Sequence, residues 1–151
     1  MTTTVDILDD LSSFTGKELG ASLWVHVDQA RINTFADATD DHQWIHVDPE
    51  KAKDGRFGQT IAHGYLILSL LIPMWAEIRE VRNVRTEVNY GLNKLRFPSP
   101  VPSGSKIRMT ATLAAVEAIP GAAQVTVDAH VERQGGDKPV CVAQLVLRYL
   151  N

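Results

Sequence analysis

The chain has a single cysteine, Cys141, among its 151 residues. One thiol excludes an internal disulfide and any metal site that needs several cysteines. Because Cys141 falls on the apolar phase of a late strand pattern, we interpret it as a buried, inert thiol. This cysteine usage fits a reducing compartment, and the cytoplasm is the expected location.

An excess of basic charge is also lacking. The chain has 15 Lys and Arg against 18 Asp and Glu, for a formal net charge of -3. This balance gives no general field that would attract nucleic acid or an anionic membrane, so we expect neither as a partner. A ligand that carries phosphate would have to be held by a local cluster of basic side chains.

Long apolar runs are missing too. The most apolar stretch, Tyr65 to Trp75, is about half of the roughly 20 residues that a membrane helix needs. The N-terminal stretch MTTTVDILDDLSSF contains acidic residues and no basic leader, which argues against a secretory signal. With 44% hydrophobic residues, the chain suits one domain over residues 1–151.

Helical patterns occupy the first half of the chain, which shows no internal repeat. Asp28 is a favoured N-cap, and the apolar spacing after it predicts a helix through Ala38. Asp48 and Pro49 form a cap and first-turn pair for a further short helix. The stretch 61–78 is apolar nearly all the way round, which predicts a helix surrounded by other structure.

Strand patterns dominate the second half. Apolar and polar residues alternate over 106–115, 125–131 and 141–149, which is typical of strands with one buried face. A short strand is also expected from Ser22 to Val27. Helices followed by a run of strands predict an α+β domain, with an antiparallel sheet packed on one long apolar helix.

Ionisable side chains gather just before and at the start of the apolar helix: Asp40, Asp41, His42, His46, Asp48 and His63. Taken singly, each has an ordinary interpretation, since aspartates cap turns and histidines pack in cores. Mixed histidine and carboxylate ligands also suit a metal ion, but no HExxH or comparable ligand spacing is present. We therefore expect no metal site here.

Four landmarks in this region resemble the signature of the MaoC-like (R)-specific enoyl-CoA hydratases. They are Phe35-Ala36, Asp41 with His46, Phe57-Gly58 and His63-Gly64, in the same order and at compatible spacings. Residues 89–104, NYGLNKLRFPSPVPSG, resemble the strand that follows the helix in that family. The wording is most similar to the single-domain branch with nodulation protein N-like and mycobacterial hydratase members.

The resemblance implies a hot-dog fold and the reversible addition of water to trans-2-enoyl-CoA, giving (3R)-3-hydroxyacyl-CoA without a cofactor or metal. In the family, the D-x4-H pair holds one water molecule. Here His46 would take a proton from that water, and Asp41 would orient it and return a proton to the α-carbon. Asp40 is the nearest rival for the carboxylate role.

Three more residues are expected to position the substrate. Unsatisfied amides at a helix start stabilise negative charge, so the thioester carbonyl is expected near Gly64. His63 would help to shape that helix start, although a purely structural role is the alternative. Ser69 matches a position that lines the site in the family, but its hydroxyl could instead bond to its own helix.

Coenzyme A brings phosphates, and the basic residues best placed by sequence are Lys94 and Arg96. A second cluster, Lys51, Lys53 and Arg56, is an open alternative. The family usually closes its exposed sheet edge and ligand channel by dimerising, so a homodimer is expected.

One position departs from the family pattern. Many members have asparagine and proline inside the D-x4-H pair, where this chain has Gln43 and Trp44. The indole could narrow the pocket, which affects substrate range more than chemistry. Two other functions stay open on the same fold: an acyl-CoA thioesterase, and a non-catalytic module that binds an acyl thioester.

Overall fold

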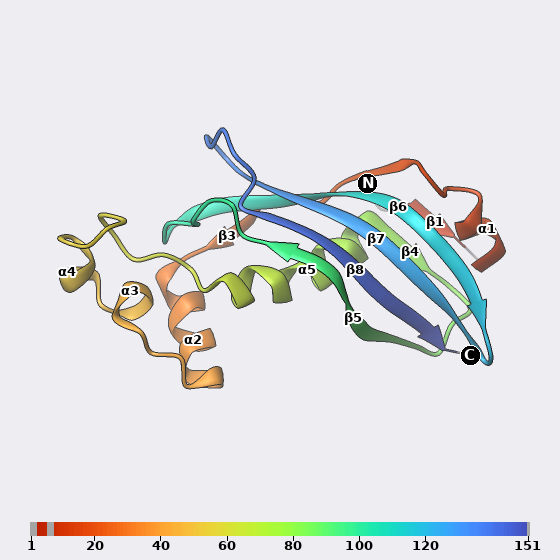
Figure 1. Cartoon of the computed structure of the whole chain (residues 1–151), viewed down its shortest axis with the longest axis horizontal. Helices are drawn as coiled ribbons and strands as arrows, with labels where there is room; N and C mark the ends of the chain where they lie inside the picture. The colour runs from red at the N-terminus through yellow and green to blue at the C-terminus, as the bar shows by residue number, and fades with distance from the viewer. Residues whose placement is uncertain (1–2, 6–7, 151) are drawn as a thin grey trace.

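A curved antiparallel sheet wraps around one long helix in the computed structural model, which describes residues 3–5 and 8–150 (Figure 1). The sheet has six strands in the order β2-β6-β7-β8-β5, and β3 also pairs with β6. These strands are β2 (Glu18–Ala21), β3 (Val25–Val27), β5 (Thr86–Arg96), β6 (Ser105–Ile119), β7 (Ala122–Arg133) and β8 (Cys141–Leu150). A parallel pair joins β1 (Thr3–Val5) to β4 (Arg79–Val81). This arrangement confirms the predicted α+β hot-dog fold.

The predicted period of two holds in the long strands. In β7, Val125, Val127 and Val131 are fully buried, because every second side chain faces the helix. Cys141 lies at the start of β8 and is fully buried. Burial raises the pKa of its thiol to about 11, which confirms the interpretation of an inert core cysteine.

The central helix is α5 (Gly64–Ile78), which the sheet covers along its length (Figure 1). Its buried residues lie on one side of the helix: Leu66, Ile67, Leu70, Leu71, Met74, Trp75 and Ile78. Tyr65, Ser69, Pro73 and Ala76 on the other side are exposed, so the prediction of a helix surrounded by other structure is only partly confirmed in the single chain. Near its C-terminal end, the indole Nε1 of Trp75 donates a hydrogen bond of 2.8 Å to the hydroxyl of Tyr149. Among the helices of residues 3–5 and 8–150, none has the length and apolar character that crossing a membrane requires.

The shorter helices are α1 (Leu8–Ser12), α2 (Gln29–Thr39), α3 (Trp44–Val47) and α4 (Pro49–Ala52). Helices α2, α3 and α4 lie together beyond one end of the sheet, where α5 begins (Figure 1). The side chain of Asp28 accepts a hydrogen bond from the Arg31 amide and caps α2, as predicted. Asp48 caps α4 through the Lys51 amide in the same way.

The expected strand from Ser22 to Val27 is partly wrong, because β3 begins only at Val25. The hydroxyl of Ser22 accepts the hydrogen bond of the Met109 amide, and the Leu23 amide donates to the carboxylate of Glu77. Side chains therefore replace main-chain partners in this segment, which interrupts the ladder.

Candidate active site

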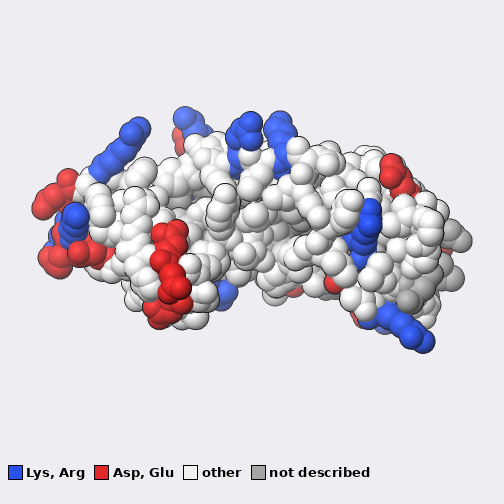
Figure 2. Space-filling view, turned by 60° about the horizontal axis from the view of Figure 1, so that its bottom comes forward, with Lys and Arg blue, Asp and Glu red and all other residues white. Residues whose placement is uncertain are grey.

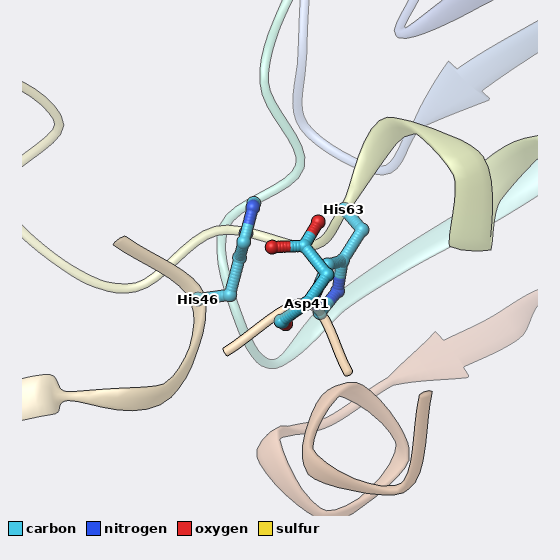
Figure 3. Close-up of side chains that lie close together, drawn as sticks. All are labelled: Asp41, His46 and His63. Carbon is cyan, nitrogen blue, oxygen red and sulfur yellow. The ribbon is translucent and has the colours of Figure 1, made fainter. Parts of the chain in front are cut away.

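Asp41, His46 and His63 meet at the N-terminal end of α5 (Figure 3). One polar atom of each side chain lies within 4.8 Å of the others. Asp41 follows Asp40, the C-cap of α2, which has a left-handed φ of 60°. His46 lies in α3, and His63 is the N-cap residue of α5. The folding of three separate segments thus brings two predicted catalytic residues beside a third ionisable side chain.

The imidazole of His46 is buried, with 7% of the residue exposed. Its Nδ1 lies 2.8 Å from the carbonyl oxygen of Ile61. Since a carbonyl only accepts, Nδ1 carries the proton and Nε2 of the neutral ring keeps a free lone pair. Burial lowers the pKa of His46, while the bond to Ile61 partly opposes this effect. The ring is therefore neutral near pH 7 and presents a base at Nε2.

His63 contacts both members of the predicted acid/base pair. Its Nε2 lies 2.9 Å from the main-chain carbonyl oxygen of Asp41. Its ring stacks on that of His46, with centroids 3.9 Å apart and an interplanar angle of 22°. Phe35, from the predicted Phe35-Ala36 landmark, packs against His63 at a centroid distance of 4.9 Å.

The side chain of Asp41 is exposed, in contrast to the two histidines. Figure 3 shows its carboxyl group alongside their rings. An exposed carboxylate beside a buried imidazole can hold one water molecule against the imidazole Nε2 and still receive solvent. Asp40, the rival carboxylate, lies one residue earlier at the end of α2 and is not among the three side chains that meet.

A cavity of about 270 Å³ opens beside this cluster. Its walls are mostly apolar and come from the α3 region, the start of α5 and the loop after β5: His46, Phe57, Ile61, Ala62, Gly64, Ile67, Phe97, Pro98, Ser99, Pro100, Val101 and Val140. An apolar pocket with one convergent basic group suits the reactive end of an acyl substrate.

Gly64 lies where the cavity meets the start of α5. A Cβ at this position would be 2.8 Å from the ring of Phe97, so the close approach of that ring requires glycine. The first amides of an α-helix have no acceptor within the helix. The predicted role of Gly64 toward a carbonyl stays a prediction, and Phe97 is a wall residue that sequence reasoning did not identify.

Ser69 lies apart from the cluster. Its hydroxyl donates a hydrogen bond of 2.8 Å to the carbonyl of Tyr65, one turn earlier in α5. It lines a second groove of about 520 Å³ between α5 and β5, together with Leu68, Ile72, Pro73, Asn89, Tyr90, Gly91, Leu92 and Leu145 to Leu147. The structure therefore places Ser69 away from His46, and its role in the site stays a prediction.

The two groups of basic residues proposed for coenzyme A lie on different surfaces, and on the face in Figure 2 the Lys and Arg side chains are scattered as separate groups rather than gathered in one patch. Lys94 pairs with Gln144 and Arg96 with Val142 across β5 and β8. Cross-strand partners share a face, so both basic residues lie on the outer face of the sheet, away from α5. In the alternative cluster, Lys53 forms an ion pair with Glu50 at 2.9 Å. Arg56 of that cluster directly precedes Phe57, which lines the cavity beside His46.

Trp44 does not narrow this cavity. A Cβ at Gly55 would lie 2.9 Å from the indole of Trp44, and Lys51 lies over the same ring with its Nζ 4.8 Å from the centroid. The indole thus packs on the end of α4, away from the cavity beside His46.

Gln29 is a further contributor that the sequence did not reveal. Its Nε2 donates to the main-chain carbonyl of His46 at 2.7 Å, and its Oε1 accepts from the hydroxyl of Thr60 at 2.6 Å. Gln29 thus connects the first turn of α2 to α3. No local pattern indicates this contact, because the two residues are 17 positions apart.

A shared metal ion fits the cluster poorly. Imidazole binds metals through lone pairs in the ring plane, at about 2.0–2.1 Å from zinc. The stacked rings of His46 and His63 direct these lone pairs side by side rather than toward one point. His42, one of the other ligand candidates, instead bonds to Asp37 at 2.9 Å.

Comparisons with known proteins agree with this fold. The 3-hydroxyacyl-thioester dehydratase Z of Mycobacterium tuberculosis is 49% identical over 148 residues, which cover 97% of this chain and 98% of that protein. Nodulation protein N of Rhizobium leguminosarum is 43% identical over 92% of this chain and 88% of its own length. Among solved structures, a monoamine oxidase regulatory protein from Archaeoglobus is 26% identical, with a TM-score of 0.80 over 100% of this chain and 98% of that one.

A family model, described as the MaoC like domain, matches residues 10–135. This span contains all four landmarks, the clustered Asp41, His46 and His63, and the whole of α5. The model match and the identity to the two curated relatives confirm the resemblance found in the sequence: the chain belongs to the MaoC-like family.

Proposed function

We propose that this protein is a hydratase that reversibly adds water to a trans-2-enoyl-CoA thioester and gives the (3R)-3-hydroxyacyl product. The observation that carries the proposal is the geometry of His46, whose Nδ1–H is fixed by Ile61, which leaves Nε2 as the basic nitrogen, and whose side chain lies beside that of Asp41. The mycobacterial relative is named a dehydratase of 3-hydroxyacyl thioesters, which is the same reaction in reverse.

In the proposed reaction, one water molecule lies between Asp41 and His46. Nε2 of His46 removes a proton from the water, and the resulting hydroxide adds to the β-carbon. The proton taken from the water then passes from His46 through the carboxylate of Asp41 to the α-carbon, so the product gains the hydroxyl group and the proton of one water molecule. His46 is left as a neutral imidazole and Asp41 as a carboxylate, which is their starting state.

Negative charge develops on the thioester oxygen as hydroxide adds. The start of α5, at the wall of the cavity, offers main-chain amides without helical acceptors and the positive end of the helix dipole. Donors fixed in advance at the site of developing charge are a strong source of rate acceleration. We assign this role to the helix start at Gly64, and the scheme uses no cofactor or metal.

The test is the loss of enoyl-thioester absorbance when the protein is mixed with crotonyl-CoA, followed by chiral analysis of the product. Asp41→Asn and His46→Gln are each expected to lose at least about a hundredfold in kcat. Asp40→Asn is the matched control and should keep its rate within about twofold, since asparagine tolerates the left-handed backbone of Asp40. Release of free thiol would favour the thioesterase, and no reaction with short or long enoyl-CoA would favour the binding module.

We also propose that residues 1–151 act as one domain that forms a homodimer through β5. This strand pairs with β8 and lies at the end of the strand order. Val88, Tyr90 and Leu92 expose 41%, 57% and 40% of their surface along it. A long, apolar edge strand is a template for pairing, and a second copy would also cover the groove beside Ser69. Light scattering of the wild type and of Tyr90→Lys tests this, and a wild-type monomer would contradict it.

A further inference from the structure

We propose that His63 is a positioning residue, which holds the acid and the base of the reaction in one arrangement by bonding to the main chain of Asp41 and stacking on His46. The inference rests on the proposed hydratase function and goes beyond the helix-shaping role that the sequence indicated. Each of its two contacts is made by a different part of the imidazole, so the contacts can be removed separately.

The first contact fixes the loop that carries Asp41. Nε2 of His63 faces the carbonyl oxygen of Asp41 at 2.9 Å, and because a carbonyl only accepts, this nitrogen carries the proton. The loop otherwise turns sharply at Asp40 and enters α3 at Trp44. Its other local bond is long, with 3.5 Å between the Gln43 amide and Oδ1 of Asp41. The short bond from His63 therefore fixes the position of Asp41 relative to the two histidines.

The second contact fixes the plane of His46. The edge of its ring is held at Nδ1 by Ile61, and its face lies on His63 at a centroid distance of 3.9 Å. Phe35 also packs against the ring of His63, at a tilt of 57°, and helps to hold it in place. A rotation of His46 about its side chain would break both the edge bond and the stack. Nε2 is thus kept in one direction.

The protonation of His63 follows from the same geometry. With the proton on Nε2, its Nδ1 is a bare acceptor that is buried and has no hydrogen-bond partner within the part of the chain that the structure describes. A second proton would place a buried charge against the ring of His46. Burial is the main cause of the lowered pKa of His46, and the electrostatic influence of His63 acts in the same direction, while Asp41 opposes it.

His63 also connects the pair to α5. It is the N-cap residue of that helix, and its main-chain carbonyl accepts from the amides of Leu66 and Ile67. One buried residue, His63, therefore contacts Asp41, His46 and the helix start that is proposed to bind the thioester oxygen. Since misplacement by about 1 Å can cost about a hundredfold in rate, a common anchor for these groups has a direct kinetic effect.

Two variants separate the contacts. His63→Phe keeps a planar ring for stacking but removes the donor to Asp41. His63→Gln keeps an amide donor but removes the aromatic ring. His42→Gln is the matched control, because this neighbouring histidine is exposed and bonds to Asp37 instead. The measurements are kcat and KM with crotonyl-CoA, and the NMR titration of the His46 imidazole.

We expect His63→Phe to lose at least about tenfold in kcat with KM within about twofold, while His46 still titrates at low pH. In His63→Gln, kcat should fall less than in His63→Phe. The pKa of His46 should rise toward its ordinary value, and the acid limb of the pH-rate profile should move to higher pH with it. His42→Gln should change neither quantity. A role in folding alone would reduce the folded fraction, measured by circular dichroism, without moving the titration.

Wild-type kcat and an unchanged His46 titration in both His63 variants would overturn the inference, even if Asp41→Asn and His46→Gln are inactive. If the wild type hydrates no enoyl thioester, the proposed function fails instead. The NMR titration needs no turnover, so an unchanged titration of His46 in His63→Gln would then still overturn the coupling. If only one of the two variants folds, wild-type kcat in that variant overturns the inference.

Discussion

Buried polar side chains lie near both ends of α5, but their hydrogen bonding differs between the two ends. At the N-terminal end, His46 and His63 bond to main-chain carbonyls and each keeps one ring nitrogen free. Near the C-terminal end, the indole of Trp75 donates to Tyr149, whose hydroxyl in turn bonds to the carboxylate of Glu87. The N-terminal end leaves ring nitrogens of two histidines open. At the C-terminal end, Trp75 and Tyr149 bond to each other, and Arg79, the C-cap of α5, packs its guanidinium on the ring of Phe14 with two buried nitrogens that have no hydrogen-bond partner among the described residues.

This difference separates reactivity from stability within one helix. A buried acceptor without a partner is costly, and such atoms are found where a ligand or a reaction uses them. A network with satisfied partners instead strengthens the core. Substitutions at the N-terminal end should therefore lower the rate more than the stability, and substitutions at the C-terminal end should do the reverse.

The largest effect is expected for Trp75→Ala, which leaves a cavity in the core and removes the donor to Tyr149. Removing a buried tryptophan side chain typically costs about 3–5 kcal/mol in the free energy of unfolding. Urea denaturation measures this loss, and the rate per folded molecule should stay within about twofold. Trp75→Phe, which keeps most of the volume, should lose less. A large fall in rate for either variant at full folding would break the comparison.

The next effect is expected for Gly64→Ala, whose Cβ would meet the ring of Phe97 at 2.8 Å. The displaced ring and the new methyl group would disturb the helix start, so we expect kcat/KM to fall about tenfold, equal to about 1.4 kcal/mol. Steady-state kinetics measures it, with little change in the urea midpoint. Adding Phe97→Leu should restore part of the rate. Full activity in Gly64→Ala would mean that no substrate oxygen lies there.

A smaller effect is expected for Asp28→Ala, which removes the N-cap of α2. The Arg31 amide loses its acceptor, and the loss of such a cap costs about 1 kcal/mol. The cap lies at the opposite end of α2 from Asp41, and the substitution leaves in place the side chain of Gln29 that bonds to the main chain of His46, so kcat should change little. Asp28→Ser, which retains a capping oxygen, is the control and should be nearly as stable as the wild type. A fall in kcat for Asp28→Ala alone would show that the site depends on the whole of α2.

The smallest effect concerns two histidines four positions apart. Burial lowers the pKa of His46, whereas the hydrogen bond to Asp37 raises that of His42. NMR titration should therefore find His46 titrating below 6.5 and His42 above it. Between the folded pKa of His46 and 6.5, this residue binds more protons in the unfolded chain than in the folded protein. The stability that His46 contributes is therefore lost as the pH falls through this window. The contribution of the exposed His42 to stability changes with pH in the opposite direction. A pKa of His46 above that of His42 would contradict the assignment.

Much of the fold was predictable, because the patterns are local. The apolar stretch from 61 to 78 contains the central helix, which begins at Gly64, the alternating stretches are strands, and Asp28 and Asp48 cap the helices that follow them. The D-x4-H motif also indicated which carboxylate and imidazole would meet. In each case, residues that are close together in the sequence determine the local structure.

The rest depends on contacts between distant segments. The stack of His46 on His63 requires the α3 region to fold back on the start of α5. The contact of Phe97 with Gly64 joins the first residue of that helix to the loop after β5. The face on which Lys94 lies follows from the register with β8, which shifts between Leu92 and Lys94. A shift of one residue changes the face of a side chain, and no periodicity in the sequence reports it.

The burial of the only cysteine has a practical consequence for labelling. A thiol with a pKa of about 11 is almost fully protonated at pH 7, and Cys141 is also closed to solvent. A cysteine introduced at an exposed position would therefore be the one reactive thiol, with no need to remove the native one. With Tyr90→Cys on β5, a spin label or a thiol cross-linker would report whether two copies of this strand lie edge to edge.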